Sequence, residues 1–252
     1  MEKTIIDKIT IYNEDYRKVM PLYPDKYFDL CYDDPEWGIG ADKPSIKPDR
    51  VIQKNGKSLS IARTEHHKQS WDSTPVDNEF FEIVKSKSRE QIIWGVNYYD
   101  YLLKGGRIIW DKLNGECDQF DGEIAYCSLH NRIDIIYYKW HGMIQGVYCG
   151  RDISKAIIQQ GNKKLNEKRR HPTQKPLILE KYILSKYAKP NERILTTHGG
   201  SLNSAIACMY LDLECVICEI DPIHYSNGIN EIIRHQKLIE IEKQQLSFFT
   251  NK

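Results

Sequence analysis

The chain has 252 residues, of which 40% are hydrophobic and 28% charged, with a formal net charge of +1. This composition is ordinary for a globular protein, and the length suits one large α/β domain. No apolar run has transmembrane length and the first residues lack a signal-peptide pattern, so we expect a cytoplasmic protein with no membrane contact. The seven cysteines lack the spacing of a disulfide framework or a zinc site, so we expect reduced thiols and no metal.

The pattern of apolar residues predicts strands that alternate with helices. Strands are expected at 27–33, 91–96, 107–110, 123–128, 133–140, 193–195 and 214–220, and helices at 77–89, 177–187, 203–211 and from about residue 225. This alternation predicts an α/β fold with a doubly wound, mainly parallel sheet. Ligands bind such a sheet at the edge where the parallel strands end.

Two segments, 41–68 and 151–175, are polar, basic and typical of long loops. The first has seven Lys or Arg against three acidic residues, and the second has eight against two. Such runs are most often solvated surface, but basic loops beside a catalytic strand also supply contacts to DNA phosphates. The candidate DNA-binding residues are Lys163, Lys164, Lys168, Arg169 and Arg170.

The first motif that indicates chemistry is the Asp34-Pro35-Glu36-Trp37 sequence at the end of a buried strand. An enzyme that modifies a flipped base needs an acceptor for the exocyclic N–H, a second acceptor from a backbone carbonyl, and an aromatic face. Asp34, the Pro35 carbonyl and Trp37 could supply these in turn. The alternative is a strand that ends in an Asp-Pro turn beside a buried tryptophan.

The second motif is HPTQKP, residues 171–176, just before a predicted helix. Its prolines hold the segment extended, and Pro176 suits the start of the helix. Thr173 and Gln174 could then hydrogen-bond an amino-acid moiety, and Lys175 could meet a carboxylate. An ordinary helix start is the alternative.

The third motif is a strand–loop–helix unit over residues 193–220. Gly199 and Gly200 allow a ligand to approach the backbone, and the helix near Asn203 offers free N–H groups. Glu219 follows at the end of the next strand, where one carboxylate can accept both hydroxyls of a ribose. The glycine pattern departs from GxGxxG, so a tight turn with a surface acid is the alternative.

Together these motifs resemble the small, circularly permuted DNA adenine-N6 methyltransferases of bacteria, phages and mobile elements. The resemblance covers almost the whole chain and includes IYNEDYRKVMPLYPDKYFDL, SWDS, IIWGVNYYDYLLKGGRIIWDKLNGE, EIAYCS, HPTQKP, THGGS, CEID and QQLSFF. It implies a Rossmann-like fold that binds S-adenosylmethionine and methylates N6 of an adenine flipped from double-stranded DNA. It also implies a role in restriction–modification.

The resemblance further implies how a single methyltransferase domain, 1–252, is organised. Residues 1–40 and 77–116 form the catalytic half, and 171–252 form the cofactor-binding half. A flexible basic loop, 41–76, interrupts the catalytic half, and an inserted target-recognition segment, 117–170, lies between the two halves.

Carried over by position, Asp34, Pro35 and Trp37 match the catalytic D-P-P-aromatic motif of the family, and Glu36 replaces its second proline. Aspartate rather than serine at position 34 favours adenine over cytosine as the target. The residues that match the cofactor-binding motifs are Thr173, Gln174, Lys175, Thr197, His198, Gly199, Gly200, Ser201 and Glu219.

Three positions depart from the family pattern. Glu36 places a carboxylate in the catalytic motif, Thr196 stands where aspartate is usual, and Leu202 stands where glycine is frequent. These departures leave open a catalytically inactive DNA-binding protein or partner subunit, and a methyltransferase that acts on RNA or protein. The intact Asp34, Trp37 and HPTQKP motif favour an active enzyme, alone, as a homodimer or with a methyltransferase-like partner.

Overall fold

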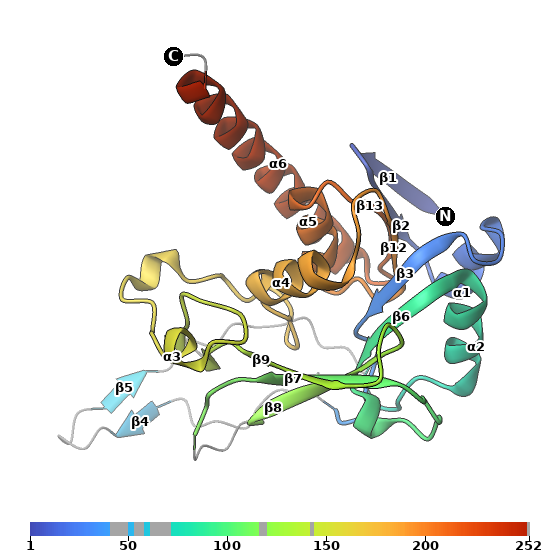
Figure 1. Ribbon diagram of the computed structural model, residues 1–252, viewed down its shortest axis with the longest axis horizontal. Coiled ribbons are helices and arrows are strands. Elements are labelled where there is room, and N and C mark those ends of the chain that lie inside the picture. The colour runs from blue at the N-terminus through green and yellow to red at the C-terminus, as the bar shows by residue number, and fades with distance from the viewer. Residues whose placement is uncertain (41–49, 53–57, 61–71, 116–119, 142–143, 251–252) are drawn as a thin grey trace.

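The computed structural model describes residues 1–40, 50–52, 58–60, 72–115, 120–141 and 144–250. Its centre is a nine-stranded sheet in the order β1-β2-β13-β12-β3-β6-β8-β7-β9 (Figure 1). The strands are β1 Glu2–Ile6, β2 Ile9–Asn13, β3 Phe28–Asp33, β6 Ser88–Trp94, β7 Gly106–Asp111, β8 Gly122–Cys127, β9 Ile133–Tyr137, β12 Arg193–Thr196 and β13 Glu214–Cys218. Within this sheet, the neighbouring strands β2, β13, β12, β3 and β6 run parallel to one another, whereas β1 and β8 are antiparallel to their neighbours.

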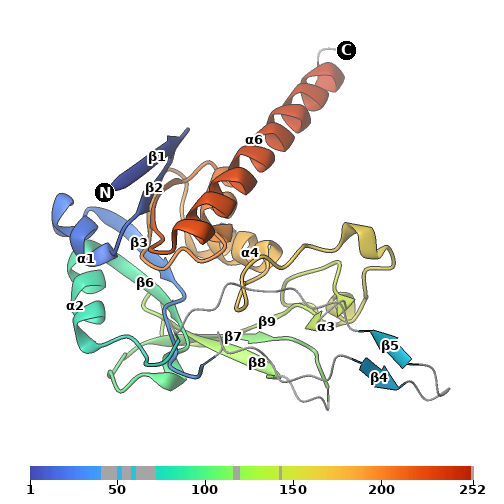
Figure 2. The ribbon, with the colours of Figure 1, turned by 180° about the vertical axis from the view of Figure 1, so that it is seen from behind.

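Helices cover both faces of this sheet (Figures 1 and 2). On one face lie α1 Tyr16–Val19, its extension η1 Met20–Leu22, and α2 Asn78–Lys87. On the other lie α4 Leu177–Tyr187, α5 Asn203–Tyr210 and α6 Pro222–Thr250, whose C-terminal part extends beyond the body. The remaining elements are two hairpins, β4 Arg50–Ile52 with β5 Ser58–Ser60 and β10 Trp140–His141 with β11 Ile144–Gln145, and the short helices η2 Val96–Tyr98, α3 Ile153–Ala156 and η3 Lys163–Leu165. The predicted α/β class with a doubly wound, mainly parallel sheet is confirmed.

Each face of the sheet has its own apolar core. Ile183 and Ile206 belong to the core under α4 and α5, and Phe80 and Val84 belong to the core under α2. The alternation of side chains along β13 illustrates the division, because Cys215 lies in the first core and Cys218 in the second. Both thiols are buried, as the strand pattern predicts.

The predicted elements differ from the structure mainly at the sheet edges. The β1–β2 hairpin was not predicted, because β1 is an edge strand with largely exposed side chains and shows no clear alternation. The predicted strand 133–140 is divided between β9 and β10. The predicted strand 214–220 ends at Cys218, which leaves Glu219 in the loop after β13.

The order of the strands brings distant parts of the chain together. β12 lies directly beside β3, with Ile194 paired to Leu30 and Leu195 to Cys31. Because the two strands are parallel, the loops that follow them leave the same edge of the sheet. The Asp34–Trp37 motif and the loop of Gly199 and Gly200 therefore adjoin.

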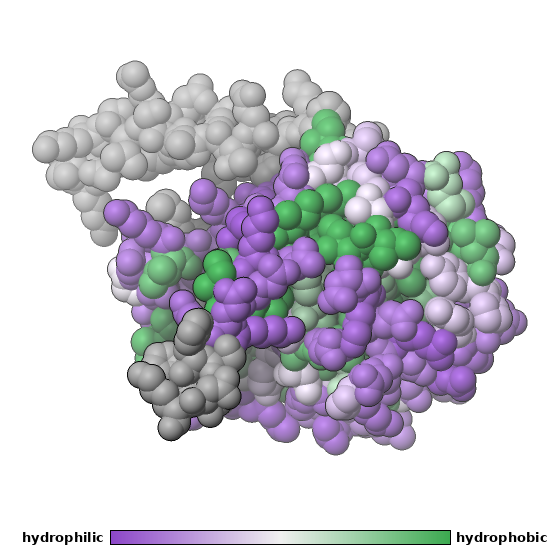
Figure 3. Space-filling view, turned by 90° about the horizontal axis from the view of Figure 1, so that it is seen from above, coloured by the Kyte–Doolittle hydropathy of each residue, from purple (hydrophilic) through white to green (hydrophobic). Residues whose placement is uncertain are grey.

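In the part of the chain that the structure describes, no helix is both long and apolar enough to span a membrane. Figure 3 shows a largely hydrophilic face on which apolar side chains gather near the centre. Most of the predicted flexible loop, 41–76, lies outside the described residues.

Candidate functional site

The ends of β3, β12 and β13 border a cavity of about 1040 Å³. Every predicted catalytic and cofactor-binding residue lines it: Asp34, Pro35, Glu36, Trp37, Thr173, Gln174, Lys175, Thr197, His198, Gly199, Gly200, Ser201 and Glu219. Of the predicted DNA-binding residues, Arg169 alone lines it. Within the described ranges, no group of three His, Cys, Asp or Glu residues is arranged to hold a metal.

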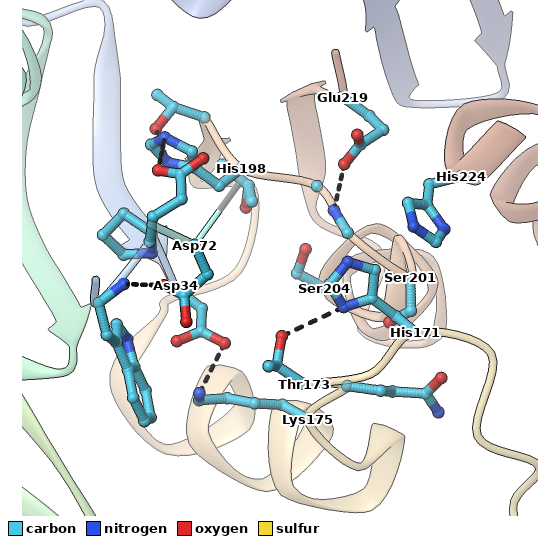
Figure 4. A pocket seen from close by; sticks show the side chains of 18 of the residues that line it. Asp34, Asp72, His171, Thr173, Lys175, His198, Ser201, Ser204, Glu219 and His224 are labelled. Carbon is cyan, nitrogen blue, oxygen red and sulfur yellow. Dashed lines mark hydrogen bonds and ion pairs between the residues drawn. The ribbon is translucent and has the colours of Figure 1, made fainter. Parts of the chain in front are cut away.

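Asp34 has one paired and one unpaired carboxylate oxygen. Its Oδ2 lies 2.6 Å from Nζ of Lys175 (Figure 4). Its Oδ1 is buried and accepts no hydrogen bond from the described residues. Burial raises the pKa of Asp34 to about 6, although Lys175 opposes the shift. The side chain therefore keeps one buried acceptor at the cavity.

Lys175 is buried among acids and aromatic rings. Its Nζ also lies 3.0 Å from Oε2 of Glu123, 4.9 Å from the ring centre of Trp37 and 4.8 Å from that of Trp94. Burial by itself would lower the pKa of this ammonium, but Asp34 and Glu123 outweigh burial and raise it. The carboxylates that Lys175 meets thus belong to the chain itself, and Glu123 is a site residue that the motifs did not reveal.

Trp37 is held against a neighbouring ring. It stacks on Tyr98, with 5.1 Å between ring centres and 17° between planes. Gly95 has a φ of +75°, and a Cβ there would lie 2.3 Å from Nε1 of Trp37, so both its backbone and its neighbour require glycine. The loop after β6 therefore fixes the tryptophan beside Asp34.

A second segment holds the backbone that follows Glu36. Oδ1 of Asp72 accepts hydrogen bonds from the N–H groups of Trp37 at 2.9 Å and Gly38 at 2.8 Å. The Val76 N–H donates to the Glu36 carbonyl at 3.2 Å. Asp72 is the acid of the SWDS sequence, which the resemblance includes but to which it gives no role.

Glu36 pairs with His198, across two loops. Nε2 of His198 lies 3.2 Å from Oε2 of Glu36, and Nδ1 lies 3.2 Å from Oδ2 of Asp33. Burial alone would raise the pKa of Glu36, but His198 outweighs it and lowers the pKa to about 2. Burial alone would lower the pKa of His198, but Glu36 and Asp33 raise it well above its usual value. The acid of the Asp34–Trp37 motif is therefore ion-paired.

Asp33 joins the end of β3 to the loop after β12. Its carboxylate accepts hydrogen bonds from the Thr197 hydroxyl and, at 3.1 Å, from the His198 N–H. The motifs did not single out Asp33. Strand alternation directs its side chain to the opposite face of the sheet from that of its neighbour Asp34. Its partners follow 164 and 165 residues later, so only the strand order could identify them.

Glu219 is fixed by backbone N–H groups of the loops that follow β12 and β13. Its Oε2 accepts the Gly200 N–H at 2.5 Å (Figure 4). Its Oε1 accepts the Asp221 N–H at 2.7 Å. Burial raises its pKa to about 7. The carboxylate thus lies at the cavity with a defined orientation.

In the HPTQKP segment, Gln174 contacts the chain itself. It donates to Oε1 of Glu167 at 2.6 Å and to the Lys168 carbonyl at 3.2 Å, and it accepts the Arg170 N–H at 2.8 Å. Glu167 also accepts the Leu177 N–H at 2.8 Å, at the start of α4. Glu167 is one of the two acidic residues in the basic segment 151–175, and no motif singled it out. A cofactor contact of Gln174 stays a prediction.

The two remaining departures from the family pattern are buried. The Thr196 hydroxyl donates to the Tyr32 carbonyl at 2.9 Å, so it joins two strands of the sheet. Leu202 has a left-handed φ of 57° and a fully buried side chain. Both residues therefore pack within the protein.

The predicted DNA-binding residues fall into two groups. Lys163, Lys164 and Lys168 are exposed. Arg170 is paired with Glu231 of α6 at 2.8 Å, and the Arg169 guanidinium lies 5.4 Å from the ring centre of Trp140. Arg169 is exposed like the three lysines, whereas Arg170 is partly buried in its ion pair.

Comparison with known proteins gives a fold. No family model and no curated protein matches the chain. A crystal structure of an M1.HpyAVI–SAM complex aligns with a TM-score of 0.50 at 16% identity, over 88% of this chain and 99% of that one. PvuII DNA methyltransferase (cytosine-N4-specific) aligns with a TM-score of 0.48 at 10% identity, over 90% of each chain. TTHA0409, a putative DNA modification methylase from Thermus thermophilus complexed with S-adenosyl-L-methionine, aligns with a TM-score of 0.45 at 13% identity, over 89% of this chain and 93% of that one. The likeness to the first structure, together with the sheet order, shows that this chain has a Rossmann-like fold.

Proposed function

We propose that the chain is a DNA methyltransferase that uses S-adenosylmethionine to methylate N6 of an adenine flipped out of double-stranded DNA. One observation carries the proposal: Oδ1 of Asp34 is buried at the cavity and lacks a hydrogen-bond donor among the described residues. A buried acceptor without a donor costs about 1–3 kcal/mol. Such an oxygen suits a donor that a ligand supplies, and the amino group of a base is one.

The other side of the cavity fits the cofactor. Both oxygens of Glu219 accept backbone N–H groups and keep further lone pairs that can accept the two ribose hydroxyls. A Cβ on Gly200 would meet no atom closer than 3.8 Å, so a ligand can approach this backbone. The carboxylates in the lining favour a sulfonium cation.

Two oxygens of the catalytic motif are placed to orient the target amine. Oδ1 of Asp34 would accept one N6–H, and the carbonyl of Pro35 would accept the other. The Tyr99 hydroxyl lies 3.5 Å from the Pro35 carbonyl oxygen and 3.0 Å from the Trp94 carbonyl oxygen. Because the hydroxyl has one hydrogen and donates it to the closer oxygen of Trp94, the Pro35 oxygen remains available. These two acceptors would favour a pyramidal nitrogen whose lone pair points away from them.

S-adenosylmethionine supplies a methyl group activated by a positively charged sulfur. The chain would contribute positioning and electrostatics, which account for much of the acceleration in direct transfers. Lys175 would hold Oδ2 of Asp34 so that Oδ1 faces the amine. Trp37 would support the base ring, and Asp34, with a pKa of about 6, could take up the proton that N6 loses.

The test is incubation of the full chain with methyl-labelled S-adenosylmethionine and unmethylated genomic DNA, followed by nucleoside analysis. Label in N6-methyladenine, lost in Asp34→Ala, is the expected result. Label in N4-methylcytosine would show that the chain methylates cytosine and not adenine. Binding of cofactor and DNA without transfer would indicate an inactive DNA-binding or partner subunit. Label in RNA or protein instead would replace the DNA proposal.

A further inference from the structure

We propose that Glu36 and His198 act as one positioning unit that keeps the loop of Asp34 in register with the cofactor loop. This inference rests on the proposed function and concerns two residues that would contact neither the base nor the methyl group. Glu36 is one half of this pair, and the other half, His198, lies 162 residues later in the chain.

The geometry places the imidazole between two carboxylates of one short segment. Asp33 and Glu36 flank Asp34 and Pro35, the residues whose oxygens would accept the N6–H groups. His198 contacts Asp33 through Nδ1 and Glu36 through Nε2, each at 3.2 Å. Both ends of the catalytic segment are therefore attached to one side chain.

That side chain comes from the loop that would hold the cofactor. His198 lies two residues before Gly200, whose N–H is bound to Glu219. The backbone N–H of His198 also donates to Asp33 at 3.1 Å, and the Thr197 hydroxyl donates to the same carboxylate, so three contacts join the loop to the strand end. A shift of His198 would therefore change the separation between the methyl donor and the acceptor oxygens.

Because His198 and Glu36 carry opposite charges, each side chain is stabilised by the other. The side chains of His198 and Glu36 are 15% and 28% exposed. The imidazole is otherwise bordered by the Thr197 hydroxyl and by the rings of Tyr16 and Phe80. Arg17 and Glu219 also act electrostatically on the pair. Removal of His198 leaves Glu36 without its ion-pair partner, and removal of Glu36 leaves Nε2 of His198 without its acceptor; either loss is costly in a largely buried site.

This dependence predicts that a proline at position 36 is harmful while His198 remains. Glu36→Pro removes the acceptor for Nε2 and leaves an imidazolium beside Asp33 alone. The neighbouring rings make phenylalanine a suitable uncharged replacement for His198. We therefore expect Glu36→Pro/His198→Phe to retain more activity than the two single variants predict.

The first experiment is a double-mutant cycle on methyl transfer to unmodified DNA. Glu36→Pro and His198→Phe should each lower kcat at least about tenfold and change KM for DNA by less than about twofold, because small misplacements act on the transfer step. The double variant should lose at least about tenfold less than the product of the two single losses. Losses that multiply, or that fall on KM alone, would overturn the proposal. Asp212→Asn, which alters an exposed ion pair with Lys8, is the matched control.

A second experiment does not require transfer. Histidine NMR of the free protein should show that Glu36→Gln lowers the titration midpoint of His198, whereas Asp212→Asn leaves it unchanged. Calorimetry should show weaker binding of S-adenosylmethionine to Glu36→Gln, and no such effect of Glu36→Gln when His198 is already phenylalanine. An unchanged midpoint, or an effect on binding that persists without His198, would overturn the proposal. If both results hold in a chain that transfers no methyl group, the coupling stands and the proposed function fails.

Discussion

Buried Lys175 and half-buried Asp34 form an ion pair in which Nζ lies 2.6 Å from Oδ2, and the second oxygen of the aspartate is left without a donor from the described residues. The pair holds the carboxylate in one orientation. Burial still raises the pKa of Asp34 to about 6, so this acceptor titrates close to neutrality. The proposed reaction should therefore depend on pH.

We predict that methyl transfer requires ionised Asp34. Because its pKa is raised to about 6, the carboxylate is lost as the pH falls through that value, and the single-turnover rate should decline about tenfold per pH unit below it. Asp34→Asn should lower the rate by about 10²–10³ and remove this pH dependence. Single-turnover rates measured at saturating cofactor would check both. A rate that stays constant down to about pH 5 would exclude this role.

A second prediction concerns the cofactor and Glu219. Glu219→Ala should weaken S-adenosylmethionine binding by about 1.5–3 kcal/mol, the usual value of hydrogen bonds to a charged group. Since the pKa of Glu219 is raised to about 7, the accepting form is lost, and affinity should fall, as the pH drops through that value. Titration calorimetry at several pH values measures both effects. Equal affinity in the variant would remove Glu219 from the cofactor site.

The third prediction concerns DNA. Because Arg170 is paired with Glu231, the exposed lysines are the better candidates for phosphate contacts. Replacement of Lys163, Lys164 and Lys168 by alanine should reduce the slope of log affinity against log salt by about 0.9 for each phosphate that is no longer neutralised. The control replaces three exposed lysines elsewhere, Lys189, Lys237 and Lys243. If both triple variants change the slope equally, this segment has no special role.

The fourth prediction concerns stability. Leu202 is fully buried, and a Cβ on Gly228 of α6 would lie 2.3 Å from its Cδ1. Alanine in a helix is normally more stable than glycine by about 0.5–1 kcal/mol, but here Gly228→Ala should destabilise by about 1–3 kcal/mol through overpacking. In a Leu202→Ala background the same change should be neutral or stabilising. Urea unfolding of the four proteins tests this, and an additive result would refute the contact.

Local sequence patterns predict the elements where those patterns are strong. The predicted helix 177–187 matches α4, and Asp77, predicted at the start of a helix, accepts the Phe80 N–H at 3.1 Å at the start of α2. The sequence does not predict β1, whose largely exposed side chains show no clear alternation. Alternation of apolar and polar residues arises where one face of a strand is buried, so an edge strand with little burial cannot be predicted from it.

The sequence by itself determined the local motifs: Asp34–Trp37 and the glycine loop with Glu219 follow strands whose ends share one edge of a parallel sheet, and HPTQKP precedes a helix. Only the tertiary structure decided how these motifs contact one another. It put β12 beside β3, which brings Asp33 and Glu36 to His198, and it buried Lys175 between Asp34 and Glu123. These pairs join residues more than 50 positions apart, so no local periodicity encodes them. Their charges also depend on burial, which exists only once the sheet and its helices have assembled.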